Sequence, residues 1–138
     1  MEIKQYNGLC DDAMYIRETV FVNEQGFRDE FDEIDKSAVH LVAYDEDKPV
    51  ATCRFFWSDE RNTYLLGRLA VLKEYRKNHL GSIIMNMAEA LVRENNGVSI
   101  ELHAQEQAIK FYEKQGYSVC SEMEYEEHCP HYWMRKKL

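Results

Sequence analysis

The stretch Tyr-Arg-Lys-Asn-His-Leu-Gly-Ser at residues 75–82 indicates the fold more clearly than any other part of the chain. It follows the apolar run 69–72 and opens a segment whose apolar residues recur at helical spacing, namely Leu80, Ile83, Ile84, Met87 and Leu91. The order is strand, short basic turn, helix. The start of such a helix has unpaired backbone N–H groups, and Gly81 allows a ligand to approach them closely. Arg76 and Lys77 add positive charge, so this turn predicts a site for a polyphosphate.

This turn differs from the two common phosphate-binding loops, because the chain has neither GxxxxGK[ST] nor GxGxxG here. It resembles the acyl-CoA pyrophosphate loop of the GNAT acetyltransferase superfamily, [Q/R]-x-x-G-x-[G/A]. Arg76 takes the first place and Gly81 the last, while His79 stands where the first glycine is usual. The departure at His79 is tolerable if its backbone angles are helical, since no positive φ is then required.

A second segment, residues 100–117, resembles the same superfamily. The superfamily often shows the pattern Asn-x-x-Ala-x-x-Phe-Tyr-x-x-x-Gly-[Phe/Tyr] here. This chain has Gln105 in place of Asn, followed by Ala108, Phe111, Tyr112, Gly116 and Tyr117. The Ala-Gln before this helix is similar to the ElaA-like and YjcF-like branch. Residues 20–25, 40–42, 125–127 and 130–131 also resemble that branch, so the resemblance covers nearly the whole chain in the expected order.

The order of elements predicts a single α/β domain over residues 1–138, with a mixed sheet and helices on both faces. Strands are expected at 3–6, 40–44, 50–56, 64–72, 98–104, 117–122 and 132–134. Helices are expected at 80–95, at 106–115, and after Asp11 or Asp12 with an apolar face of Met14, Ile16, Val20 and Phe21. The resemblance implies the GNAT-like form of this architecture, in which a strongly bent central sheet splays open in the middle.

Composition narrows the class of protein. The formal net charge is −8, which argues against nucleic acid as a partner. No apolar run is long enough for a membrane span, and no N-terminal signal peptide is recognisable. The four cysteines lack CxxC spacing, so we expect reduced thiols in a cytoplasmic protein. No metal is expected, because His128, Cys129 and His131, even with Cys120, are too crowded for a zinc site.

The resemblance implies that acetyl-CoA is the co-substrate. It also implies the residues that bind it: the strand backbone at Leu69, Ala70 and Val71; the turn at Arg76, Lys77, Asn78, His79, Leu80, Gly81 and Ser82; and the side chains of Gln105 and Tyr112. His79 is expected to be exposed. The longer side chain of Gln105 replaces an asparagine that commonly reaches the pantetheine arm in relatives.

Amine acetylation needs proton transfer, because a lysine-like amine is neutral less than about one part in a thousand at pH 7. By family resemblance Tyr112 is the general acid for the departing thiolate. Four residues are candidates for the base: Glu24, His40, His103 and His131. His131 and Glu24 are preferred, since they lie in segments 24–35 and 125–131, which the resemblance places around the acceptor. Both segments are rich in acids, which favours a cationic acceptor.

Arg54 and Arg68 lie within apolar strands, where an unpaired charge is costly. They either pair with local acids, which we favour, or recognise a carboxylate on the acceptor.

The sequence therefore predicts an N-acetyltransferase that transfers an acetyl group from acetyl-CoA to a primary amine by direct attack in a ternary complex. The acceptor is a small-molecule amine or a protein lysine or N-terminal amine, and the family often forms homodimers. Two alternatives remain at this stage. One is a non-catalytic acyl-CoA-binding regulatory module. The other is a protein-interaction domain with a partner surface of Tyr117, Tyr125, Tyr132 and Trp133.

Overall fold

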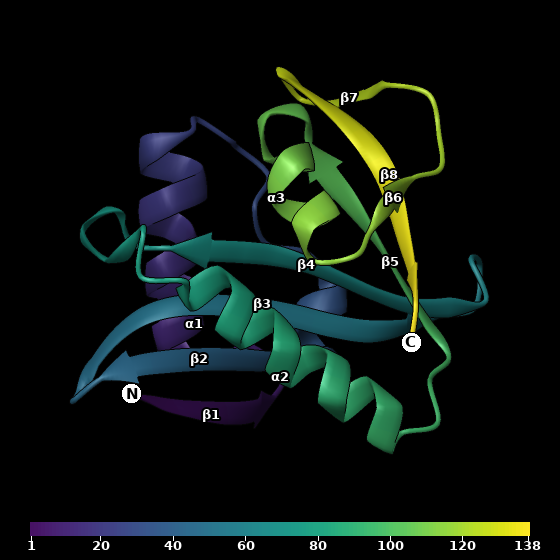
Figure 1. The fold of residues 1–138 in the computed structure, drawn as a ribbon. Coiled ribbons are helices and arrows are strands. Elements are labelled where there is room, and N and C mark those ends of the chain that lie inside the picture. Colours follow the sequence, from purple (N-terminus) through teal and green to yellow (C-terminus); the bar gives the residue numbers. More distant parts are fainter.

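The computed structural model describes all residues 1–138 and contains one mixed sheet of eight strands (Figure 1). Seven strands follow the order β1-β2-β3-β4-β5-β8-β6, and β7 pairs with β8. Their bounds are β1 Glu2–Asn7, β2 Val39–Asp45, β3 Lys48–Ser58, β4 Thr63–Val71, β5 Ser99–Gln105, β6 Ser118–Val119, β7 Glu124–Glu126 and β8 Cys129–Lys137. Every pairing is antiparallel except that of β4 with β5, so the predicted mixed sheet is confirmed.

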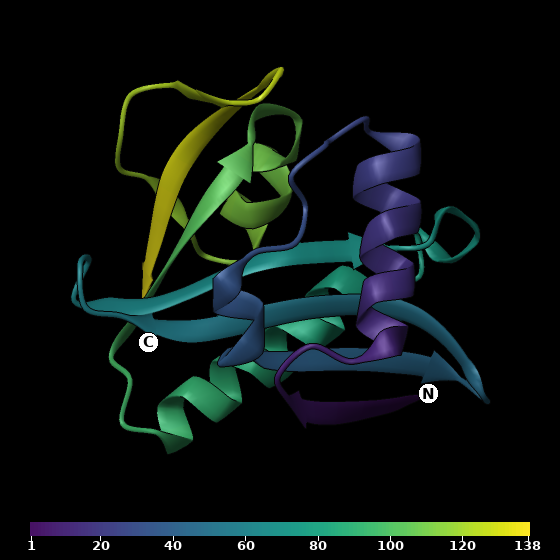
Figure 2. The same ribbon diagram turned by 180° about the vertical axis from the view of Figure 1, so that it is seen from behind.

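Helices cover both faces of the sheet. α1 (Asp11–Arg17) lies on one face and α2 (Leu80–Glu94) on the other, as the two opposite views show (Figures 1 and 2). Successive side chains of β2 point to opposite faces of the sheet, and each face has its own hydrophobic core. Leu41 and Ala43 pack in the core that contains α2, whereas Val42 and Tyr44 pack in the core that contains α1. α2 is the longest helix at 15 residues, and none is long and apolar enough to cross a membrane.

The first helix continues as a π-helical turn, η1 (Glu18–Glu24), and the chain then turns at Gly26 with φ 81°. Ile16, Val20 and Phe21 are buried as predicted. The prediction was wrong for Met14, which is exposed, since it lies off the stripe of residues that face the sheet. After η1 the chain runs through the acidic segment to a short 3₁₀ helix, η2 (Glu33–Lys36).

The sheet splays open between β4 and β5. These parallel strands pair only at Tyr64–Ile100 and Leu65–Glu101, near one end of each strand. Beyond that point β4 keeps its bonds to β3, but its other edge faces no strand. A bulge in β4 accompanies the split, and Arg68 there has φ 52°. The expected central opening is therefore present.

The C-terminal third differs most from prediction. The strand expected at 117–122 is only two residues long, and the last strand extends over nine residues instead of three. The helix expected at 106–115 is a 3₁₀ turn, η4 (Glu106–Ala108), followed by α3 (Ile109–Lys114). Tyr117 is buried and donates to Glu89, so it belongs to the core and not to an aromatic partner surface. All four cysteines are unpaired thiols.

Candidate functional site

The turn before α2 contains two left-handed residues, Lys77 with φ 75° and His79 with φ 59°. The condition of helical angles at His79 is not met, because the chain turns twice between the 3₁₀ turn η3 (Lys73–Tyr75) and α2. No side chain caps α2. Helical geometry leaves the amides of its first residues without partners within the helix. Such a concave set of amides at a helix N-terminus binds anions.

Gly81 lies inside α2, against α3. A Cβ atom at this position would lie 3.0 Å from Cζ of Phe111, which is closer than side chains normally pack. The neighbouring Ser82 Oγ accepts a hydrogen bond from Gln115 at 2.8 Å. The absence of a side chain at Gly81 therefore allows the close contact between the two helices.

Arg76 and Glu24 form an ion pair beside this turn. Both guanidinium Nη atoms contact the carboxylate, and Arg76 Nε donates to the Val71 carbonyl at 3.0 Å. The hydrogen bond from Arg76 lowers the pKa of Glu24 below its ordinary value. Glu24 does not line the cavity described below. A paired carboxylate of lowered pKa is a poor proton acceptor, so the geometry favours the other base candidates.

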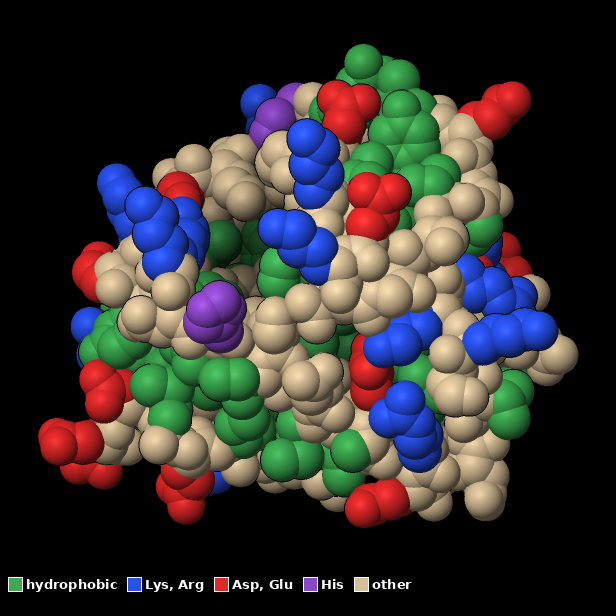
Figure 3. Space-filling model, viewed as in Figure 1, with side chains coloured by type: hydrophobic (Ala, Val, Ile, Leu, Met, Phe, Trp, Pro, Cys, Tyr) green, Lys and Arg blue, Asp and Glu red, His purple; other side chains and the backbone are tan.

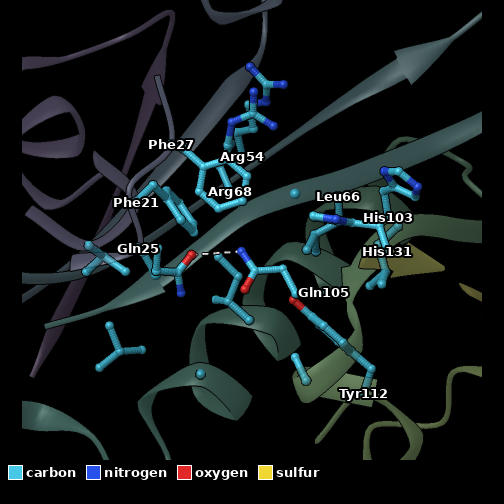
Figure 4. Close-up of a pocket in the computed structure, with 18 of the residues that line it drawn as sticks. Phe21, Gln25, Phe27, Arg54, Leu66, Arg68, His103, Gln105, Tyr112 and His131 are labelled. Carbon is cyan, nitrogen blue, oxygen red and sulfur yellow. Dashed lines mark hydrogen bonds between the residues drawn. The ribbon is translucent and has the colours of Figure 1, made fainter. Parts of the chain in front are cut away.

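Tyr112 on α3 is partly buried and lines the cavity. Its hydroxyl makes no hydrogen bond to the protein, and in Figure 4 it points toward the pocket on the same side as Gln105. Burial raises the pKa of Tyr112 well above its usual value, so the hydroxyl keeps its proton at neutral pH. The structure thus leaves an unshared phenol donor at the cavity surface.

Gln105 ends β5 and reaches across the opening to the end of η1. Its Nε2 donates to Gln25 Oε1 at 2.8 Å (dashed in Figure 4), and its own oxygen accepts from Gln107. Gln25 was not identified from the sequence, because its partner lies 80 positions away. This amide bridge joins the two sides of the splayed sheet.

Three arginines neutralise the acidic segment after η1. Arg17 is fully buried and contacts Glu30 at 2.8 Å and Asp35 at 2.7 Å. The contacts of the other two are Arg54 with Asp32 and Asp35, and Arg68 with Glu30 and Asp32. The favoured prediction of local ion pairs for Arg54 and Arg68 is confirmed. Arginines balance the charges of Glu30, Asp32 and Asp35, so these three acids offer little free negative charge to an acceptor.

Burial has opposite outcomes for two of these carboxyl groups. It raises the pKa of Glu30, and the arginine contacts do not fully offset it. Burial would also raise the pKa of Asp35, but hydrogen bonds from Arg17, the Asp32 amide and Arg54 outweigh it and hold the pKa far below its usual range. Asp35 is therefore the ionised centre of the network.

The remaining histidine candidates occupy different places. His40 is fully buried under η2, where its Nε2 lies 3.0 Å from the Asp35 carbonyl, and it does not line the cavity. His103 and His131 lie on the neighbouring strands β5 and β8 with ring centroids 4.8 Å apart, and both line the cavity. Glu126 on β7 lies next to both rings, and sequence reasoning placed it in a pocket segment but did not single it out.

Glu126 contacts both rings. Its Oε1 lies 2.9 Å from His103 Nδ1, and its Oε2 lies 3.3 Å from His131 Nε2. The hydrogen bond from His103 lowers the pKa of Glu126, so its carboxylate stays ionised in this wall. Trp133 stacks on the outer face of His103 with centroids 4.6 Å apart.

One cavity of about 970 Å³ joins these parts. It runs from the start of α2 along the unpaired edge of β4 to the histidines, and Tyr112, Gln105 and Arg68 line it. Figure 3 shows the surface hollowed between the start of α2 and α3, with Lys and Arg side chains gathered around the hollow. Of the predicted cofactor residues, Asn78 and Ser82 do not line this cavity, whereas Leu69, Ala70, Val71, Arg76, Lys77, His79, Leu80, Gly81, Gln105 and Tyr112 do.

Comparisons with known proteins agree with this geometry. Residues 6–117 match the model of the acetyltransferase (GNAT) family. YjcF of Bacillus subtilis (strain 168), named an uncharacterized N-acetyltransferase, is 40% identical over 128 residues, which cover 91% of this chain and 90% of YjcF. The crystal structure of Escherichia coli ElaA superposes with a TM-score of 0.85 at 24% identity, covering 98% of each chain.

An aminoglycoside 6′-N-acetyltransferase solved in complex with coenzyme A shares the fold, with a TM-score of 0.78 at 18% identity over 99% of this chain and 97% of that one. The family match spans most of the chain and includes both segments that carry the resemblance. This chain belongs to the GNAT family of N-acetyltransferases.

Proposed function

We propose that this protein binds acetyl-CoA and a primary amine together and transfers the acetyl group by direct attack of the amine. The observation that carries the proposal is the single cavity, which joins the open amides of α2 to the His103–Glu126–His131 wall. One continuous cavity of this size has room for the thioester end of one substrate and the amine of the other.

Acetyl-CoA supplies the activated acetyl thioester, and the site's donors suit its two polar parts. For the diphosphate there are the amides of residues 78–82, with Arg76 and Lys77 beside them. For the pantetheine arm there are the unpaired edge of β4 at Leu69, Ala70 and Val71, and the Gln105 amide. The related fold of a protein solved with coenzyme A supports this choice of ligand.

In the proposed mechanism His131 accepts the proton of the incoming ammonium, and Glu126 holds that ammonium by charge. His131 Nδ1 lies 3.0 Å from the Cys129 carbonyl, which only accepts hydrogen bonds, so Nδ1 carries the ring proton and Nε2 has the free lone pair. The amine nitrogen then forms the bond to the acetyl carbon as the C–S bond breaks. Tyr112 donates its proton to the departing thiolate, and the second proton that the nitrogen loses on becoming an amide returns to Tyr112 through solvent.

Calorimetric titration with acetyl-CoA tests the first half of the proposal, with adenosine 3′,5′-bisphosphate and acetyl phosphate as partial ligands. We expect micromolar binding that needs the whole molecule. CoA-thiol release with a panel of small amines, lysine peptides and free N-terminal peptides tests the second half. Binding without release for every amine would favour a non-catalytic acyl-CoA-binding module, and no binding would contradict the proposal altogether.

A further inference from the structure

Three strands bring two imidazole nitrogens and one carboxylate to a single point on the cavity wall. The residues are His103 on β5, His131 on β8 and Glu126 on β7. One nitrogen or oxygen atom from each lies within 4.8 Å of the other two. Figure 4 shows the labelled His103 and His131 side by side at this wall.

The outer nitrogen of each ring already faces an oxygen. His131 Nδ1 lies 3.0 Å from the Cys129 carbonyl. His103 Nε2 lies 2.9 Å from a Glu124 carboxylate oxygen, although it is not aligned for a good hydrogen bond. The Cys129 carbonyl only accepts hydrogen bonds, so in a neutral His131 ring the single N–H is on Nδ1 and Nε2 carries a lone pair. In a neutral His103 ring the N–H is on Nδ1, which donates to Glu126, and Nε2 makes no hydrogen bond.

His131 Nε2 therefore faces Glu126 Oε2 at 3.3 Å with a lone pair, while His103 Nδ1 donates to Glu126 Oε1 at 2.9 Å. Acceptor against acceptor at the His131–Glu126 contact is unfavourable unless something positive lies between the two atoms. One divalent cation bound in place of the His103 Nδ1 proton would contact all three side chains and remove this repulsion.

We propose that His103, Glu126 and His131 form a binding site for a divalent transition-metal ion of the Zn²⁺ type. Two imidazoles and one carboxylate are the protein ligands of open zinc sites, and the cavity leaves the fourth position free. Ligand atoms about 2.0–2.1 Å from a tetrahedral metal are about 3.3 Å apart. The three candidate ligand atoms, one from each residue, lie within 4.8 Å of one another, so metal binding requires side-chain rotation to bring them closer. Imidazole ligands disfavour Mg²⁺ and Ca²⁺.

The surroundings have the form of an outer coordination shell. Metal-bound histidines commonly donate their other N–H to a carbonyl or carboxylate, as the Cys129 carbonyl and the Glu124 carboxylate allow here. The site differs from the adjacent His-Cys-Pro-His stretch considered from the sequence. His128 is exposed and packs against Phe27, and Cys129 contributes its carbonyl and not its thiol.

A metal ion at this site would occupy His131 Nε2, to which the proposed function assigns proton transfer, and Glu126, to which it assigns binding of the ammonium. Bound Zn²⁺ therefore blocks acetyl transfer, and the metal-free protein is the active form. This blocking rests on the proposed function, whereas the binding itself does not.

The test uses the full chain, freed of metal by chelator and dialysis and then titrated calorimetrically with ZnCl₂. We expect one ion per chain, no binding of MgCl₂, and a visible tetrahedral spectrum with CoCl₂. His103→Gln and Glu126→Gln should each weaken Zn²⁺ binding by at least about 100-fold, because losing even an outer-shell partner costs about 10–100-fold. His128→Gln removes an exposed histidine of the same hairpin and should leave binding unchanged. Circular dichroism confirms that each variant folds.

Absence of Zn²⁺ binding, or equal binding by wild type and Glu126→Gln, overturns the site. A loss in His128→Gln as large as in His103→Gln also overturns it. A separate assay of CoA release, with and without saturating Zn²⁺, tests the blocking. Turnover that persists with the metal bound contradicts it, and a lack of turnover without metal counts against the proposed function alone.

Discussion

Arg76 Nη1 lies 2.6 Å from Glu24 Oε2, and Arg76 Nη2 lies 2.8 Å from Glu24 Oε1. The arginine at the start of the proposed diphosphate site is thus held by a carboxylate 52 positions earlier in the chain. The same contact neutralises its charge. We therefore expect Glu24 to act on the proposed diphosphate site through Arg76, although the sequence suggested it as a base.

In Glu24→Gln we expect Arg76 to keep its charge without a counter-ion, so that acetyl-CoA binds about fivefold tighter. This change corresponds to about 1 kcal/mol, the size of the interaction between two charges close together near water. The kcat should not change. Calorimetry and steady-state kinetics measure both. Glu18→Gln, which removes the same charge from the exposed start of η1, is the control. A fall in kcat of about 100-fold or more in Glu24→Gln would instead identify Glu24 as the base.

Tyr112→Phe removes a hydroxyl at the cavity surface that has no hydrogen-bond partner in the protein, so the free energy of unfolding should change little. If this hydroxyl protonates the leaving thiolate, kcat should fall by about 10²–10⁴-fold while the KM for acetyl-CoA stays the same. Thiol release by stopped-flow and urea unfolding measure the two quantities. Tyr15→Phe on the exposed side of α1 is the control. An unchanged kcat would exclude Tyr112 as the acid.

Asp35→Asn should destabilise the fold by about 3–5 kcal/mol at pH 7, because it leaves Arg17 and Arg54 without their shared counter-ion. The pKa of Asp35 in the folded protein lies below its ordinary value of 3.8. Its contribution is therefore complete above that value and is lost as the pH falls toward the folded pKa. The gap between wild type and variant in urea unfolding should narrow below about pH 4. A gap of equal size at pH 7 and pH 3 would contradict this account.

Arg68 adopts φ 52° in the β4 bulge while its side chain pairs with Glu30 at 3.0 Å. Arg68→Ala and Arg68→Gly both remove the ion pair, but only glycine adopts this backbone conformation without strain. We expect both variants to be less stable than wild type. The free energy of unfolding of Arg68→Gly should be about 1 kcal/mol larger than that of Arg68→Ala. Comparing the two variants by chemical denaturation isolates the backbone contribution to stability, and equal stabilities would show that the bulge is unstrained.

Local patterns predicted the parts of the fold in which neighbouring residues decide the structure. α2 begins at Leu80 as its helical spacing and basic turn indicated, and the strands expected at 40–44 and 50–56 are present as the paired strands β2 and β3. The segment after Tyr117 was misplaced, because β6 and β7 are short edge strands whose ends are decided by pairing with β8. Short strands of this kind have too few residues to show an alternating pattern.

By itself, the sequence determined the family, the order of strand, turn and helix at the proposed cofactor site, and the presence of Tyr112 on a helix. These features depend on residues close together in the chain. Only the tertiary structure decided that Arg17, Arg54 and Arg68 neutralise the acids at 30–35, and that Glu126 lies between His103 and His131. Such contacts join residues on different elements, and their distances follow from the register and curvature of the sheet, which no local pattern contains.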